Sequence, residues 1–177
     1  VKAVKADYPA LRAKARARPT GFYFPFNVNP ALQASPEERA RRYEEAWARG
    51  GLPFLGAFGD LLFEKEANDT IADFAREKIR AAVKDPATAE LLCPDNVFGC
   101  KRLCVDTGYY ETYARANVTL VDLHETPMVR VTATGIETTE GAQEFDLIVW
   151  ATGFDFGTGA LLRMGIVGRD GTALAEH

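Results

Sequence analysis

The chain has few of the residues that build metal centres and disulfide frameworks. Its 177 residues include three cysteines and two histidines. The spacing of Cys93, Cys100 and Cys104 does not match a paired zinc pattern. An odd cysteine count without a secretory signal favours reduced thiols in a cytosolic protein. We therefore expect structural or incidental cysteines, no metal site and a cytoplasmic location.

Long apolar runs and a strong charge excess are also missing. No segment approaches the roughly 20 apolar residues that a membrane-spanning helix needs. The net charge is −4 and the pI is near 5.3, so the overall balance favours neither a nucleic acid nor a membrane surface. Basic residues do gather between Lys2 and Arg18, and we interpret them as a solvated helix face. No protein partner is evident.

The sequence contains no G-x-G-x-x-G motif, although its later strands look like parts of a nucleotide-binding sheet. It opens on Val1 rather than Met, inside a helical pattern, and it closes without a terminal helix. These features suggest a piece of a longer protein.

Helical patterns occupy most of the first part of the chain. Ser35 can cap a helix, Pro36 suits its first turn, and Glu38 completes a capping box. This helix should end at Gly50-Gly51, and the apolar, glycine-rich residues 51–60 that follow should form a buried turn. Helices are expected over residues 1–17, 35–49, 68–83, 85–92 and 106–113.

Short strands dominate from about residue 117. We expect strands over residues 118–122, 128–132 and 136–138 and a hairpin over residues 165–171. Leu147–Trp150 is a continuous apolar run, which predicts a strand buried on both faces, as in a parallel sheet. The turn Ala151-Thr152-Gly153 would let the backbone approach a ligand at the end of that strand. An ordinary core strand and turn is the alternative.

Lys101-Arg102 is an adjacent basic pair in a segment that looks partly buried. A buried arginine keeps its charge, so it needs an anion beside it. This pattern predicts a site that holds negative charge. The alternative is a surface pair bonded to Asp or Glu side chains.

Many separate blocks, read in order, resemble the Baeyer–Villiger monooxygenase family of the cyclohexanone and phenylacetone monooxygenase type. The resemblance covers essentially the whole chain. Its blocks include residues 35–39, 43–47, 74–80, 83–86, 98–102, 106–113, 149–155 and 168–171.

The resemblance implies an α/β fold class, with a helical insertion plus the C-terminal strands of a Rossmann-like NADP-binding domain, incomplete at both ends. Residues 1–115 would be the helical insertion. Residues 116–155 would be the closing strands of the NADP domain with the Ala-Thr-Gly hinge, and residues 156–177 would begin the return into the FAD domain.

The resemblance also implies the cofactors FAD and NADPH and a flavin-dependent oxidation of a small ketone by O2 to an ester or lactone. The family's active-site arginine, which stabilises an anionic peroxyflavin, falls on Arg102. Its neighbouring lysine, which helps hold the NADP 2′-phosphate, falls on Lys101. Ala151, Thr152, Gly153 and Phe154 fall in the segment that packs near the dinucleotides.

Two alternatives stay open at this point. A related flavin monooxygenase that oxygenates nitrogen or sulfur would share the Ala-Thr-Gly-Phe block, although Gly99-Cys100-Lys101-Arg102 favours the Baeyer–Villiger type. A non-catalytic binding module made of helices and strands is the other alternative. We expect this piece alone to be inactive, because the glycine motifs for both cofactors are not in the sequence.

Overall fold

The computed structural model describes residues 2–18, 21–24, 26–153 and 158–176. The chain divides into two compact units, Val1–Val121 and Asp122–His177. The first unit is helical, and the second contains a small sheet. Each unit is described by itself.

The helices of the first unit match the expected positions closely. The segment expected as one helix over residues 1–17 is divided at Asp7, because Pro9 in the first turn of the second helix has no N–H to continue the first. The helix expected over residues 68–83 begins earlier, at Lys65. The elements are α1 (Lys2–Ala6), α2 (Tyr8–Arg16), η1 (Ala31–Gln33), α3 (Pro36–Arg49), η2 (Leu52–Gly56), α4 (Lys65–Ala82), α5 (Pro86–Leu92) and α6 (Tyr109–Thr112).

Side-chain caps begin two of the described helices, α3 and α5. Ser35 Oγ accepts from the N–H of Glu38 at 3.3 Å, which confirms the expected start of α3. The Asp85 carboxylate accepts from the N–H of Thr88 at 2.8 Å and so caps α5. The proposed capping box at Glu38 is wrong, because the Glu38 carboxylate pairs with Arg42 at 2.8 Å instead.

The core of the first unit forms between α3, η2 and α4. Leu61 and Ile71 are its largest fully buried side chains. The turn predicted over residues 51–60 is buried as expected, and Phe54 and Phe58 contribute their rings to the core. Tyr43 contacts both rings edge-on, at centroid distances of 6.2 and 5.7 Å.

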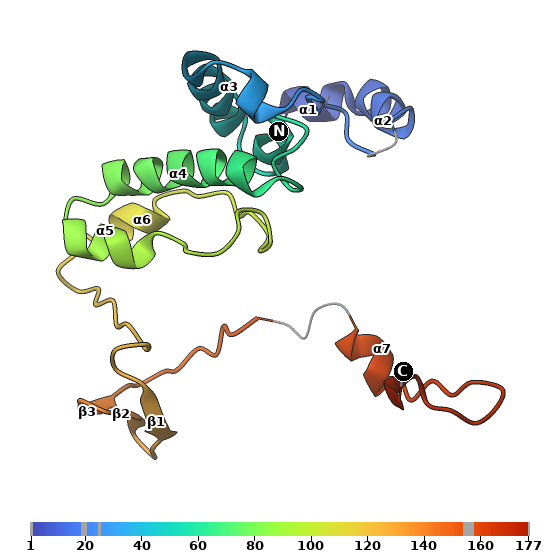
Figure 1. Cartoon of the computed structure of the whole chain (residues 1–177). Helices are drawn as coiled ribbons and strands as arrows, with labels where there is room; N and C mark the ends of the chain where they lie inside the picture. The colour runs from blue at the N-terminus through green and yellow to red at the C-terminus, as the bar shows by residue number, and fades with distance from the viewer. Residues whose placement is uncertain (1, 19–20, 25, 154–157, 177) are drawn as a thin grey trace. The chain divides into compact units, whose positions relative to one another are not determined.

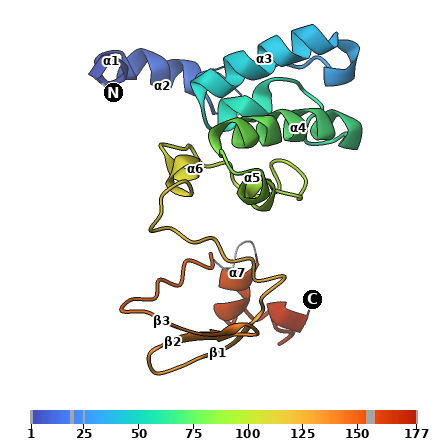
Figure 2. The same ribbon diagram turned by 90° about the vertical axis from the view of Figure 1, so that its left-hand side faces the viewer.

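The long helix α4 is the element around which the first unit is arranged. It contacts α3, η1, α5 and α6. Figures 1 and 2 show α5 and α6 along one side of α4. Ile79 and Val83 bury a second, smaller cluster against Ala89 of α5. The chain after α5 therefore starts from a fixed position on α4.

The second unit contains a three-stranded antiparallel sheet in the order β1-β2-β3, with β1 (Met128–Val131), β2 (Gly135–Thr138) and β3 (Gly141–Glu144). Figure 2 shows the three strands side by side. The strands expected over residues 128–132 and 136–138 are confirmed. The two-residue turn Thr139-Glu140 joins β2 to β3, and Gly141, the first residue of β3, has a φ of +132°.

Two expected strands are wrong. Residues 118–122 and Leu147–Trp150 form no strand, and Leu147 and Val149 are 78% and 75% exposed. A buried parallel strand needs hydrogen-bonded neighbours and covering helices. Among the described residues, no strand lies beside Leu147–Trp150. The apolar run is therefore extended but unpaired.

The end of the chain holds α7 (Gly159–Arg163) and η3 (Leu174–Glu176). The predicted hairpin is present as an antiparallel bridge between Val167 and Ala173. The N–H of Gly168 donates to the carbonyl of Thr172 at 2.8 Å across its turn. In the described segments, no helix is both long and apolar enough to cross a bilayer.

Candidate functional site

Lys101 and Arg102 lie side by side in the irregular segment between α5 and α6, and both side chains are exposed. The expectation that this segment is partly buried is wrong for the two cations themselves, although Phe98 is buried and Gly99 and Leu103 are half-buried. No carboxylate forms an ion pair with either cation in the part of the chain that the structure describes, whereas Arg41, Arg42, Arg76 and Arg80 each have one. Both charges are therefore open to an anion from outside.

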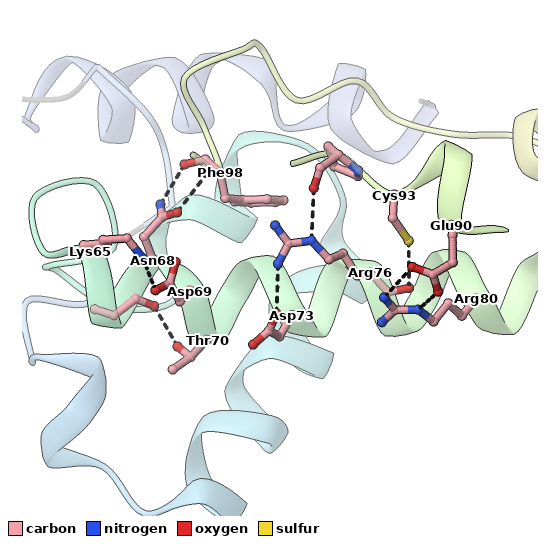
Figure 3. Close-up of polar contacts among 12 residues, drawn as sticks. Lys65, Asn68, Asp69, Thr70, Asp73, Arg76, Arg80, Glu90, Cys93 and Phe98 are labelled. Carbon is pink, nitrogen blue, oxygen red and sulfur yellow. Dashed lines mark hydrogen bonds and ion pairs between the residues drawn. The ribbon is translucent and has the colours of Figure 1, made fainter. Parts of the chain in front are cut away.

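The segment is anchored before the cations by Phe98. The Phe98 ring is buried and meets Phe54 edge-on, with centroids 5.5 Å apart. Its backbone is held by the side-chain amide of Asn68 on α4, as Figure 3 shows. The Phe98 N–H donates to Asn68 Oδ1 at 2.9 Å, and Asn68 Nδ2 donates to the Phe98 carbonyl at 2.8 Å.

Gly99 lets the chain turn sharply after this anchor. Its φ is +90°, a conformation that favours glycine. A Cβ here would lie 2.8 Å from a methyl of Leu62 and 3.0 Å from a methyl of Leu55. The N–H of Cys100 then donates to the carbonyl of Val97 at 3.1 Å and closes the turn. The glycine thus brings the backbone of the site against the core.

The segment is anchored again after the cations by Leu103, which packs against the main core. Val105 then lies beside the end of α3, since its Cγ1 is 3.7 Å from the position that a Cβ of Gly50 would take. Lys101 and Arg102 are therefore held between two packed side chains, while their charged groups face solvent. This arrangement can present two cations in a defined place without neutralising them.

Further contacts tie α4 to the start of this segment (Figure 3). Arg76 Nε donates to the carbonyl of Pro94 at 3.0 Å, and Arg76 is itself paired with Asp73 at 2.8 Å. The Cys93 thiol lies 3.8 Å from the Arg76 carbonyl. Burial raises the pKa of the Cys93 thiol, which keeps it protonated and apolar in character.

An apolar groove of about 480 Å³ borders the same turn. Leu55 and Leu62, the two side chains against Gly99, also line the groove. Its other walls include Phe22, Phe26, Leu52 and Phe58.

The remaining residues of the predicted site belong to the second unit. Ala151, Thr152 and Gly153 are exposed and irregular, and the N–H of Ala151 donates to the carbonyl of Val149 at 3.1 Å. Gly153 has a φ of +93°, in keeping with a turn made of small residues. Phe154 lies outside the described residues. The structure thus groups Lys101 with Arg102, and it holds the Ala-Thr-Gly turn in a different unit.

Asn68 is the residue that the sequence analysis missed. It is 4% exposed, and it is the only buried polar side chain in the described ranges. A signal was present, because Asn68 lies on the same helix face as Ile71, Ala72 and Ala75, where an apolar residue is expected. Among the described residues, no group of three or more His, Cys, Asp or Glu side chains could hold a metal ion.

Known monooxygenases are similar in sequence to nearly the whole of this chain. The chain is 42% identical over 171 residues to 2-oxo-Δ3-4,5,5-trimethylcyclopentenylacetyl-CoA monooxygenase of Pseudomonas putida, covering 96% of this chain and 31% of that protein. It is 44% identical over 162 residues to cyclopentanone 1,2-monooxygenase of a Comamonas species, covering 89% and 30%. No protein-family model matches the chain.

Solved structures similar to this chain are also those of monooxygenases. The fold matches an oxidized steroid monooxygenase bound to NADP with a TM-score of 0.87 and 49% identity, over 99% of this chain and 34% of that one. The chain thus spans about a third of the length of the proteins it matches. The resemblance described from the sequence and the mixed helix-and-strand fold class are both confirmed.

Proposed function

We propose that this chain is part of an FAD- and NADPH-dependent Baeyer–Villiger monooxygenase, which inserts one oxygen atom from O2 into a ketone to give an ester or lactone. The observation that carries the proposal is the close match over nearly the whole chain to ketone monooxygenases. Two adjacent cations that lack a carboxylate partner within the described ranges, on a segment anchored at Phe98 and Leu103, agree with it. The chain on its own should be inactive, because it spans only a third of such an enzyme.

The residues present fit the two cofactors by their chemistry. An ammonium and a guanidinium on an anchored backbone segment, neither paired with a carboxylate among the described residues, suit phosphate and other oxyanions. Lys101 would hold the 2′-phosphate of NADPH, and Arg102 would stabilise negative charge that develops during the oxygen transfer. When bound, NADPH supplies the electrons and FAD supplies the oxygen chemistry.

The groove beside the turn supports a ketone as the substrate. Its lining is mostly aromatic and aliphatic, which suits an uncharged organic molecule. Arg102 lies three residues after Gly99, which faces the groove side chains Leu55 and Leu62. An apolar wall that contacts the segment carrying the two cations agrees with a reaction in which negative charge must form next to a neutral substrate.

We also propose the domain assignment given by the family. Residues 1–115 are the helical insertion, residues 116–155 are the closing part of the NADP domain, and residues 156–177 begin the return to the FAD domain. In this proposal Ala151, Thr152, Gly153 and Phe154 pack near the dinucleotides. The three free thiols suit a reducing compartment, so a cytoplasmic location is part of the proposal.

The proposal is tested on the longer protein that contains this chain. The Arg102→Ala variant should still be reduced by NADPH but should form no ester from a cyclic ketone. Arg41→Ala is the matched control, because Arg41 is an exposed arginine already paired with Glu45 on α3.

Unchanged ester formation in Arg102→Ala would refute the role given to Arg102. A wild-type protein that oxygenates an amine or a thioether but no ketone would support the nitrogen- or sulfur-oxygenating alternative. A purified protein that binds no flavin would point to a binding module.

A further inference from the structure

We propose that Asn68 is a positioning residue for the Lys101-Arg102 pair, acting through the backbone of Phe98. This inference rests on the proposed function for what the two cations do. The placement of the cations by Asn68 does not depend on that function.

The Asn68 side chain is used almost completely in buried hydrogen bonds. Besides its two bonds to Phe98, Nδ2 donates to the carbonyl of Leu61 at 2.8 Å. Both N–H groups of the amide and its oxygen are thereby satisfied inside the core. A buried amide with all of its partners in place adds rigidity, and an aliphatic side chain at this position would leave three backbone groups without partners.

The two bonds to Phe98 fix one residue from both sides. They occupy its N–H and its carbonyl, as a neighbouring strand would, but the partner is a single side chain on a helix. The orientation of the peptide that enters Gly99 is therefore tied to the rigid helix α4. Arg102 is only four residues further on, and Leu103 packs against the core.

No other side-chain hydrogen bond in the described residues holds the backbone from Phe98 to Arg102 to a helix. Arg76 acts earlier, at Pro94. The Cys100 N–H bonds to Val97 within the same turn, so it closes the turn without fixing its position on the protein. In the part of the chain that the structure describes, Asn68 alone connects this turn to α4 by side-chain hydrogen bonds, and its loss should let the turn move as a unit.

Native-state hydrogen exchange on the cofactor-free, full-length protein tests the placement. The variants are Asn68→Ser, which can keep at most part of the network, and Asn68→Ala, with Tyr43→Phe as the control. Tyr43→Phe removes a different, half-buried hydrogen bond to the same helix, between Tyr43 Oη and Thr70 Oγ1 at 2.7 Å, and this bond does not involve Phe98.

The decisive amide is that of Cys100, because its acceptor is Val97 and not Asn68. We expect its exchange to accelerate about tenfold or more in both Asn68 variants and to stay near wild type in Tyr43→Phe. Acceleration confined to the Phe98 amide, which loses its partner directly, would overturn the proposal. Equal acceleration at Cys100 in Tyr43→Phe would also overturn it.

Steady-state kinetics provides the second measurement. A purely structural loss lowers the amount of folded enzyme, so it reduces kcat and leaves the KM for NADPH and the fraction of NADPH converted into ester unchanged. A misplaced cation pair should instead raise that KM and lower that fraction by about tenfold to a hundredfold. If Arg102→Ala changes neither quantity, the proposed function fails, and the exchange experiment still decides the role of Asn68.

Discussion

Arg80 on α4 holds Glu90 on α5 through two hydrogen bonds, Nε to Oε1 at 2.6 Å and Nη2 to Oε2 at 3.0 Å (Figure 3). A guanidinium and a carboxylate in this paired geometry recognise one another more specifically than a single contact does. The pair joins the two helices just before the segment that carries Lys101 and Arg102. The hydrogen bonds from Arg80 lower the pKa of the Glu90 carboxyl below its ordinary 4.5.

This pair predicts a pH-dependent stability. Because the pKa of Glu90 is lowered on folding, its contribution is complete above about pH 4.5 and is lost as the pH falls below that value. Urea midpoints measured on either side of pH 4.5 should therefore fall less in Glu90→Gln than in the wild type. Part of the pH dependence of stability should remain in Glu90→Gln, because the pKa of Asp85 is also lowered, by its hydrogen bonds with Thr88. The exposed Glu77→Gln is the control, and an equal effect of the two substitutions would contradict the prediction.

Gly99→Ala should destabilise the protein more than Gly108→Ala. Both glycines have a positive φ, +90° and +79°, so each alanine pays about 1–2 kcal/mol for that conformation. Only at Gly99 does a Cβ also meet Leu55 and Leu62, whereas nothing lies within 4 Å at Gly108. Denaturant unfolding measures the two free energies, and equal losses would show that the core does not confine the turn at Gly99.

Tyr113 should titrate late. Its hydrogen bond with Tyr109, at 2.9 Å between the two hydroxyls, together with partial burial, raises the pKa of Tyr113 from 10.0 to about 12. The neutral phenol is the form that the fold favours, so this contribution is lost as the pH rises through that range. Tyrosinate absorbance followed with pH should show a late step that moves to lower pH in Tyr109→Phe. Titration curves that coincide would contradict this result, and Tyr8→Phe is the exposed control.

Lys101→Ala should weaken the use of NADPH more than that of NADH in the full-length protein. A charged hydrogen bond to the 2′-phosphate contributes about 1.5–3 kcal/mol, so the KM for NADPH should rise about tenfold or more. NADH lacks that phosphate and should be affected little. Lys101→Arg keeps the charge and should retain most of the preference. An equal rise for both nucleotides would remove the phosphate role from Lys101.

Local signals in the sequence were sufficient where the physical cause is local. Ser35 and Asp85 cap α3 and α5 because a side-chain oxygen reaches an N–H three residues later. The resemblance to ketone monooxygenases was also readable in the sequence, since it depends on the order of the residue blocks. The Lys101-Arg102 pair was identified from that order.

Predictions from the sequence were wrong where the deciding contacts come from residues elsewhere in the chain. Leu147–Trp150 has the composition of a buried strand, but a strand exists only when neighbours pair with it, and among the described residues none does. The exposure of Arg102 could not be read from the apolar residues around it, because Phe98 and Leu103 point into the core while the cations point out.

The sequence by itself determined the helices, the hairpin, the family resemblance and the identity of the two cations, because each follows from residue types at short spacing. Only the tertiary structure decided how those cations are held. Asn68 and Phe98 are 30 residues apart, and no local rule connects a polar residue on a helix to a distant peptide. The fold brings them together because α4 and the segment after α5 share one core, where a buried backbone group must find a partner.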